Sequence, residues 1–298
     1  MTFESGEMFL LGQARLLERR LFAATFRGGA RSGTVAALLG YQNEDGGFGQ
    51  ALEPDVRAPI SLPIFVEMAF DALTSLGGRL ADPAEGSMLL AACDYLGRVA
   101  AGAGAGGAVP PAAPAIEHWP RAVHWSEWTY APGLNPTAGL VGRLHQLGVD
   151  HPWRDQAESW CWDRLDAGEV PLDAHTVKEV LVFLDHVPDR TRADTHAAAL
   201  AERFEEVAML QLDPDAEGYG VTPLQLAPTP ESRWRRLFDD KQIEGHLDRV
   251  AAAQEADGGW PITWEPPSPA AVCEWRGVVT LDALRILVAN GRMRPPDS

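Results

Sequence analysis

Hydrophobic residues recur along most of the 298-residue chain at the three- and four-residue spacing of α-helices. No alternating stretch is long enough to predict a sheet, so we expect an all-α fold. The pattern predicts helices at residues 5–26, 32–42, 62–76, 85–100, 136–147, 153–166, 174–186, 192–211, 240–255 and 269–290. The helix at 62–76 is apolar on most faces, which predicts an inner position, whereas 32–42 has a narrower apolar stripe and is expected outside.

Three segments between or after these helices have the composition of loops. Residues 100–115 consist mainly of Ala, Gly and Pro, so we expect a mobile surface loop that packs no core. With the aromatic residues that follow, this stretch predicts a long irregular insertion at 100–133. Residues 212–235 are rich in Pro and Asp and are also expected to be irregular. The tail at 291–298 is expected to fray.

One phrase occurs near both ends of the chain: Gln42–Phe48 reads QNEDGGF, and Gln254–Trp260 reads QEADGGW. Its glycines end the preceding helix, because glycine adopts the left-handed conformation without a Cβ clash. We expect the Gln side chain to bind carbonyls left free at that helix end, and the aromatic residue to fold back as an apolar plug. The match extends as far as Leu73 and Leu284. Such a repeat predicts that the first and last units are built alike and meet in a closed ring.

The Gln-x-x-Asp-Gly-Gly-aromatic phrase resembles the repeat of the terpenoid cyclases and protein prenyltransferases. The resemblance implies an α/α toroid of about five or six helical hairpins that spans residues 1–298 as a single domain. It is good at the two copies and fades between them. The acid motif of this superfamily, Asp-x-Asp-Asp, is represented only by Asp213–Ala216, which reads DPDA. Its zinc set is also missing, because Cys273 follows Val272 and not an Asp-x pair.

The net charge of −17 argues against a nucleic acid or an anionic membrane surface as partner. Cys93, Cys161 and Cys273 are far apart and predict neither a disulfide framework nor a zinc site. The acidic N-terminal residues lack the basic region of a signal peptide, and no apolar run is long enough to span a bilayer. We therefore expect a cytoplasmic protein that acts on a small-molecule substrate without a metal or cofactor. The oligomeric state stays open.

Acidic residues follow both copies of the phrase. In an α/α ring, the turns from outer to inner helices lie at one end, so Glu53 and Glu265 are expected at equivalent places around the mouth of the cavity. Two carboxylates facing a cleft are suited to acid–base catalysis. The alternative is structural, because acids also favour the positive N-terminus of a helix. Asp55 and Arg57 have no counterpart in the second copy, and this difference points to function.

The segment Glu117–Tyr130 holds three tryptophans and is not helix-periodic. Indole faces outside a regular element can line a pocket for an apolar chain, a carbocation or a sugar ring. The alternative is that these side chains pin a long loop onto the ring. A metal site from the segment's histidines and Glu127 would fit no zinc spacing. Glu127 is a candidate acid, and the candidate substrate-binding residues here are Trp119, His124, Trp125, Trp128 and Tyr130.

Glu274, Trp275 and Arg276 follow one another in the apolar helix expected at 269–290. Charged groups in an inner helix need a partner or a wet cavity, so we expect Glu274 or Arg276 to face the lumen. An ion pair to a neighbouring helix is the alternative. Trp264 lies on the expected rim and joins this substrate-binding group. Lys178 and Glu179, near His175, raise the same question, although a lone His is usually structural.

Glu53, Asp55 and Glu127 are therefore the predicted catalytic residues. The resemblance implies an enzyme that cyclises or isomerises an apolar, isoprenoid-like substrate by acid–base chemistry. One physical objection stands against it, since an acid at a helix N-terminus is driven to ionise and cannot hold a proton. Two other functions stay open: a carbohydrate-acting α/α-toroid hydrolase, lyase or epimerase, and a non-catalytic binding module. Apolar walls in the cavity would favour the isoprenoid, and many hydrogen-bonding groups would favour a sugar.

Overall fold

The computed structural model describes residues 2–78, 80, 83–126 and 130–296. Within these ranges the regular structure is entirely helical, with isolated β-bridges but no strand. None of the helices described is long and apolar enough to cross a membrane. The α-helices are α1 Phe3–Gln13, α2 Leu16–Phe26, α3 Arg31–Leu39, α4 Pro63–Thr74, α5 Pro83–Ala103, α6 Leu134–Leu147, α7 Pro152–Asp166, α8 Ala174–His186, α9 Arg190–Ala201, α10 Pro223–Leu226, α11 Asp240–Ala252 and α12 Pro269–Ala289.

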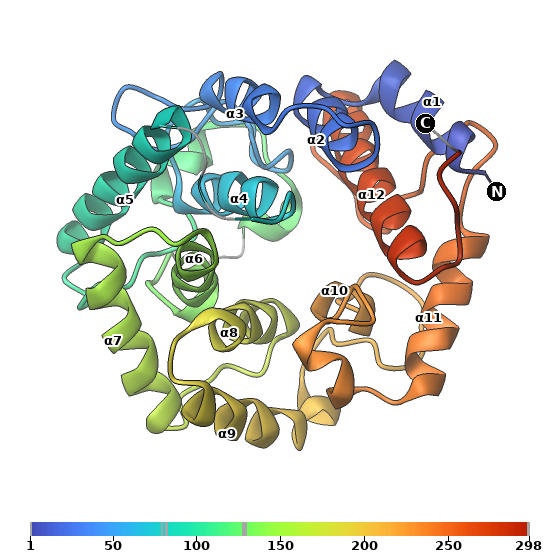
Figure 1. The fold of residues 1–298 in the computed structure, drawn as a ribbon. Helices are drawn as coiled ribbons and strands as arrows, with labels where there is room; N and C mark the ends of the chain where they lie inside the picture. Colours follow the sequence, from blue (N-terminus) through green and yellow to red (C-terminus); the bar gives the residue numbers. More distant parts are fainter. Residues whose placement is uncertain (1, 79, 81–82, 127–129, 297–298) are drawn as a thin grey trace.

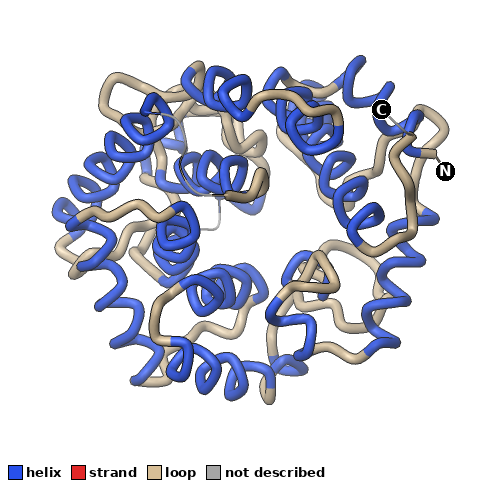
Figure 2. Tube along the Cα trace, viewed as in Figure 1, coloured by secondary structure: helices blue, strands red, loops and turns tan. Residues whose placement is uncertain are grey.

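Figures 1 and 2 show these helices in two layers around a common centre. From α3 onward the chain alternates between the layers: α3, α5, α7, α9 and α11 lie outside, and α4, α6, α8, α10 and α12 lie inside (Figure 1). The two ends of the chain meet, because α1 and α2 both pack against α12. As expected from its apolar faces, the 62–76 segment forms an inner helix.

Some helices begin or end at other residues than the hydrophobic pattern predicts. Residues 5–26 form two helices, because Ala14 and Arg15 are extended. The Arg15 guanidinium there binds Glu18 and donates to the Leu52 carbonyl at 2.8 Å. The helix expected at 192–211 ends at Ala201, and the segment expected to be irregular contains α10. At the break between α1 and α2 a contact between distant residues holds the chain, which apolar periodicity does not report.

Residues 100–115 do not form the mobile loop expected from their composition. Helix α5 runs through Ala103, and the Val109 and Ala112 side chains beyond it are fully buried. The Val109 amide donates to the Thr137 hydroxyl at 3.0 Å, and the Trp153 indole donates to the Gly107 carbonyl at 2.9 Å. Small residues pack a core here because they let the backbone itself lie against α6 and α7.

Part of the tail expected to fray at 291–298 is held in place, while residues 297 and 298 lie outside the described residues. The Met293 side chain is buried, and the backbone amides of Arg292 and Met293 both donate to the Leu287 carbonyl. Arg292 also forms ion pairs with Glu244 and Asp248 of α11. These contacts hold the chain against α11 and α12 beyond the end of the last helix.

The Gln side chain of each repeated phrase links its own turn to the next outer helix. Gln42 Nε2 donates to the carbonyls of Gly46, at 2.8 Å, and of Met88 in α5, at 2.9 Å. Gln254 Nε2 donates equivalently to Gly258, at 2.9 Å, and to the Thr2 carbonyl before α1, at 3.0 Å. The carbonyls bound belong to the turn and the neighbouring helix, not to the preceding helix end as expected. In space, α1 therefore follows the second copy as α5 follows the first.

The rest of the phrase behaves alike in both copies. Gly46, with φ of +83°, and Gly258, with φ of +92°, are left-handed, and a Cβ on either would lie within 2.4 Å of a carbonyl in the adjoining outer helix. Glycine is required there both for its conformation and for the close approach. Phe48 and Trp260 are buried, 0% and 2% exposed, which confirms the expected aromatic plug.

A buried cluster of charges joins three inner helices. Arg143 of α6 is 1% exposed, and its guanidinium lies 2.5 Å from Asp71 of α4 and 2.5 Å from Glu179 of α8. Glu67 of α4 lies 3.6 Å away. Burial alone would raise the Glu179 pKa, but the positive charges of Arg143 and Lys178 lower it to about 2. A buried cation with several carboxylates thus holds the inner layer together.

Removing this cation is expected to destabilise the fold strongly. Arg143→Ala would leave buried carboxylates without compensation, at a cost of about 3–5 kcal/mol in the free energy of unfolding. Arg203→Ala, which removes an exposed partner of Glu206, is the control and should cost about 0–1 kcal/mol. Urea denaturation measures both. Equal losses for the two variants would contradict the structural importance of Arg143.

Candidate functional site

The two repeated segments meet at the end where the chain passes from outer to inner helices. The Trp264 indole, in the loop before α12, donates to Asp55 Oδ2 at 2.9 Å. Arg57 forms an ion pair with Glu274 of α12. The two polar groups without counterparts in the second copy, Asp55 and Arg57, therefore both contact that copy. These contacts confirm that the units at the two ends of the chain are neighbours.

The loop between α5 and α6 brings a histidine to this junction. The backbone of this loop is hydrogen-bonded to residues 55–57. The Arg57 amide donates to the Pro120 carbonyl at 2.9 Å, and the Ala122 amide donates to the Asp55 carbonyl at 2.8 Å. His124 Nε2 then lies 3.7 Å from Asp55 Oδ2. The His124 side chain is 50% exposed and that of Asp55 only 3%. The buried Asp55 carboxylate thus lies next to the accessible His124 imidazole.

Glu53 lies beside this pair and is 6% exposed. Burial, followed by the negative charge of Asp55, raises its pKa well above the ordinary value, although the Trp125 side chain and nearby amides act against this rise. Burial also raises the pKa of Asp55, against the effects of Trp275, His124 and Trp264. The expectation that a rim acid would be driven to ionise by a helix N-terminus is therefore wrong, because desolvation dominates here.

The backbone before Glu53 is strained. Gln50 and Ala51 both have φ of +58°, a left-handed conformation that residues with a Cβ rarely adopt. Strain of this kind is found at functional sites, where the surrounding structure maintains it.

A tyrosine and a histidine that sequence reasoning did not select complete the cluster. Tyr219 Oη lies 3.0 Å from His175 Nε2, and their rings are stacked at 16° with centroids 5.8 Å apart. The Tyr219 ring also meets Trp264 edge-on at 5.5 Å, and Trp264 meets Trp275 at 5.1 Å. His175 is hydrogen-bonded, as a satisfied structural residue would be, and its partner Tyr219 contacts the Trp264 ring of the candidate site. The available signal was Gly218-Tyr219-Gly220, an aromatic residue in a glycine turn that resembles a degenerate copy of the repeat.

These groups have pKa values moved in different directions. Burial, and next the positive charge of Lys178, lowers the pKa of His175, which favours its neutral form. Burial raises the pKa of Tyr219, which keeps its hydroxyl protonated. The junction therefore brings a weak acid, Tyr219, into hydrogen-bond distance of a weak base, His175.

The structure brings together Asp55, Arg57, His124, Trp264, Glu274 and Trp275 from the predicted site, with Trp125 buried next to Glu53. Other predicted residues are placed elsewhere or differently. Glu265 is exposed, although its repeat equivalent Glu53 is buried. Trp119 is 36% exposed, and Tyr130 donates to Glu117 at 3.2 Å. Glu127 and Trp128 lie outside the described residues.

Arg276 has a different role from its neighbour Glu274. Its guanidinium forms ion pairs with Glu255, at 2.6 Å, and Asp257, at 2.7 Å, within the second repeated phrase. It also lies 4.6 Å from the centre of the Phe9 ring in α1. These contacts fasten the repeated turn to α12 and α1, so we assign Arg276 a structural role.

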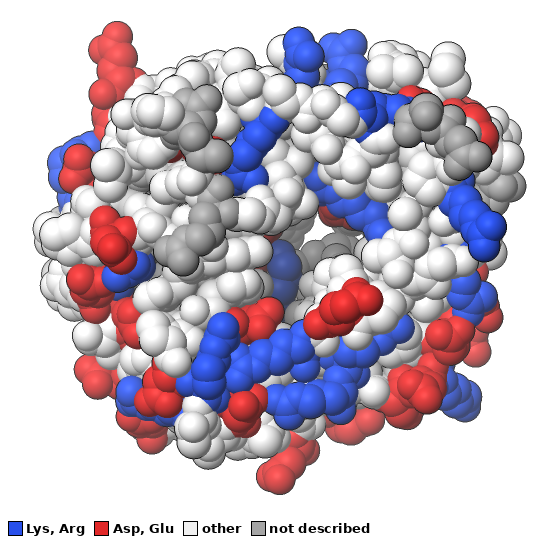
Figure 3. All heavy atoms as spheres, in the orientation of Figure 1, with Lys and Arg blue, Asp and Glu red and all other residues white. Residues whose placement is uncertain are grey.

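The face drawn in Figure 3 is hollowed between the inner helices. Charged residues of these helices stand near one another and remain accessible, with the Asp71, Asp282 and Lys178 side chains 43%, 58% and 29% exposed. Asp71 and Asp282 occupy equivalent positions in the repeat. The charges of Arg285, Asp71 and Lys178 all act on Asp282. We call the hollow between the inner helices that carry these side chains the central hollow.

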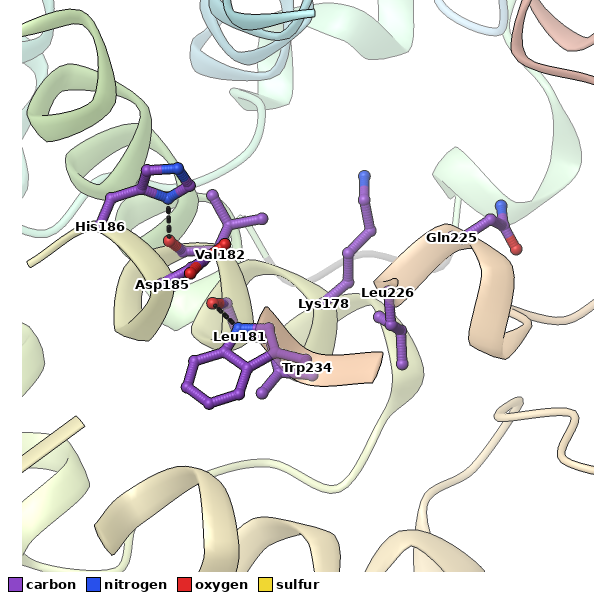
Figure 4. A pocket seen from close by; sticks show the side chains of 8 residues that line it. All are labelled: Lys178, Leu181, Val182, Asp185, His186, Gln225, Leu226 and Trp234. Atoms are coloured by element: carbon purple, nitrogen blue, oxygen red, sulfur yellow. Dashed lines mark hydrogen bonds between the residues drawn. The ribbon is translucent and has the colours of Figure 1, made fainter. Parts of the chain in front are cut away.

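A small pocket of about 60 Å³ adjoins α8 and α10. Figure 4 shows the Lys178 side chain extending away from α8, with the apolar Leu226 and Trp234 nearby. The Trp234 indole donates to the Leu181 carbonyl at 2.9 Å. The pocket is lined by Lys178, Leu181, Val182, Asp185, His186, Gln225, Leu226 and Trp234.

Comparison of the chain with protein-family models, with curated proteins and with solved structures gives no match. In the part of the chain that the structure describes, no three His, Cys, Asp or Glu side chains are grouped to hold a metal ion.

The raised pKa of Glu53 predicts a pH-dependent effect on stability. A carboxyl whose pKa is raised on folding favours the folded state below its ordinary value of 4.5, and this contribution is lost as the pH rises through the folded pKa. Glu53→Gln, which imitates the protonated acid, should therefore raise the melting temperature at pH 8 and have a smaller effect at pH 4.

Thermal unfolding at the two pH values measures this difference. Glu265→Gln, at the exposed equivalent position, is the matched control and should leave the melting temperature nearly unchanged at both. A Glu53→Gln variant that is less stable at pH 8 than at pH 4, relative to the unsubstituted protein, would contradict the burial argument.

Proposed function

We propose that this chain is an α/α toroid that works as an acid–base enzyme on a polar, carbohydrate-like small molecule. The alternation of outer and inner helices and the matching contacts of the two Gln side chains support the toroid. A fold of this kind hosts many functions, so the activity must come from the site.

The observation that carries the proposal is the contact between Asp55 and His124. Neutral His124 would take a proton from the substrate, and the Asp55 carboxylate would stabilise the imidazolium that forms. The Trp264 indole fixes the carboxylate at 2.9 Å, so Asp55 acts as a positioning residue. Glu53, whose pKa burial raises well above its ordinary value, lies beside this pair as a second possible source of a proton.

The lining of the central hollow favours a hydroxylated substrate. Accessible Asp71, Lys178 and Asp282 offer hydrogen-bonding groups suited to hydroxyls and poorly suited to a hydrocarbon chain. The Trp264 and Trp275 rings add flat faces on which a sugar can stack.

The isoprenoid-like substrate implied by the sequence resemblance is the second candidate. The same two indoles favour it, since aromatic faces also stabilise carbocations. The charged side chains of the hollow weigh against it, which is why we place the carbohydrate first.

The test is proton exchange in D₂O followed by NMR, with a panel of aldoses, ketoses, uronic acids and disaccharides, and with farnesyl diphosphate as the isoprenoid. We expect deuterium to enter a carbohydrate at a carbon beside its carbonyl. His124→Gln and Asp55→Asn should each lower this rate at least about 100-fold, the size typical of general-base catalysis. His118→Gln, an exposed histidine in the same loop, is the control and should keep the full rate.

Each arm of the experiment addresses one part of the proposal. Full exchange by His124→Gln would refute the assigned base. Reaction with farnesyl diphosphate alone would refute the carbohydrate substrate. Saturable binding without exchange or any other conversion would favour the non-catalytic binding module.

A further inference from the structure

The contact between Tyr219 and His175 has the features of a second proton-transfer pair. The residues come from different elements, the α9–α10 loop and α8, and their polar atoms lie 3.0 Å apart. Tyr219 is 40% exposed. A structural tyrosine in this chain looks different: Tyr95 is 8% exposed, and its hydroxyl donates to the Ser61 carbonyl at 2.8 Å.

Trp264 connects this pair to the pair already described. Its indole nitrogen binds Asp55, which lies behind His124, and its ring meets Tyr219 edge-on. The two pairs therefore flank one indole. The charge of His124 also acts on the His175 ring, so the two imidazoles are electrostatically connected.

We infer that Tyr219, supported by His175, is the general acid that returns a proton to the substrate after His124 has removed one. This inference rests on the proposed function and specifies its reaction class as isomerisation by proton transfer between two groups. Sites that divide acid and base roles in this way hold titratable groups in contrasting surroundings. The Tyr219 phenol beside the neutral His175 imidazole, and His124 with the buried Asp55 carboxylate next to it, meet that condition.

The step balances without a co-reactant. His124 removes the proton from a carbon beside the substrate's carbonyl; the C–H electron pair forms a C=C bond, and the carbonyl π pair moves to oxygen, which gives an enediolate. Tyr219 Oη then transfers its proton to the same carbon from the opposite face, the C=C pair forms the new C–H bond, and an oxygen lone pair restores the carbonyl, which gives the epimer.

Neutral His175, with its proton on Nε2, donates to the phenolate oxygen while Tyr219 is ionised. The proton held by His124 returns to the phenolate through water. Both groups are then in their starting states, and the product is an isomer of the substrate.

The first arm of the experiment separates removal of the proton from its return. In the D₂O assay with the carbohydrate panel, Tyr219→Phe should keep exchange within about 3-fold of the unsubstituted rate but lower formation of the isomer at least about 100-fold. Tyr95→Phe, which removes a phenol hydroxyl from outside the site, is the matched control and should change neither rate. His175→Gln should slow isomer formation about 10-fold, because it removes the stabilising imidazole.

The second arm needs no substrate. In NMR titrations of the protein with ¹³C-labelled histidine, His175 should titrate below its ordinary pKa of 6.5. His124→Gln should raise the His175 pKa, because it removes a positive charge that lowers it. A His175 titration unchanged by both His124→Gln and Tyr219→Phe would overturn the coupling of the two pairs.

The outcomes distinguish this inference from the proposed function. If His124→Gln loses exchange while Tyr219→Phe forms the isomer at the full rate, only the role of Tyr219 is refuted. Full exchange by His124→Gln refutes the proposed function itself. If no member of the panel exchanges or reacts, the proposed function fails, and the titration decides whether the two imidazoles are coupled.

Discussion

The inner layer of this protein depends on one guanidinium. Arg143 is buried in α6 and reaches carboxylates on α4 and α8, so three inner helices share its charge. Gly139 of α6 leaves room for this ion pair, since a Cβ there would lie 1.6 Å from a Glu179 oxygen and 2.3 Å from Arg143 Nη1. A buried cation of this kind is tolerated because its partners compensate the lost hydration. The position of Lys178 depends on the same cluster. Its ammonium group pairs with Glu179, and its side chain extends from α8 toward the central hollow.

The repeated phrase supplies a second constraint, which joins the two ends of the chain. Each copy fastens its turn to an outer helix through Gln and glycine contacts, and the second copy does so with α1. The candidate site arises where the copies differ. Asp55 and Arg57 correspond to Pro267 and Pro269 in the second copy, and both reach across to it. The two copies therefore have the same backbone arrangement, and this arrangement positions Asp55 and Arg57, which only the first copy carries.

The chemistry at this junction depends on burial more than on helix dipoles. Glu53 and Asp55 lie in a loop well before α4, covered by indoles and by the α5–α6 loop. Desolvation raises the pKa of both carboxyls, while it lowers that of His175. Desolvation thus favours protonated carboxyls and a neutral imidazole in one small cluster, and surroundings of this kind suit acid–base catalysis.

The amino-acid sequence by itself determined the local structure. The segment 174–186 was predicted as a helix and is one, with Asp173 capping it by accepting from the Thr176 amide at 2.9 Å. Apolar spacing and helix caps involve residues close together in the sequence, so helices can be predicted from them without knowledge of the fold. The same holds for the duplicated turn, whose glycines and aromatic plugs behave as expected.

Only the tertiary structure decided the site. The break at Ala14, the packing of Val109 and the contact between Tyr219 and His175 depend on residues distant in sequence. So does the raised pKa of Glu53, because desolvation is produced by whatever the fold places around a group. Helices are specified by neighbours along the chain, whereas burial and charge pairing are specified by neighbours in space.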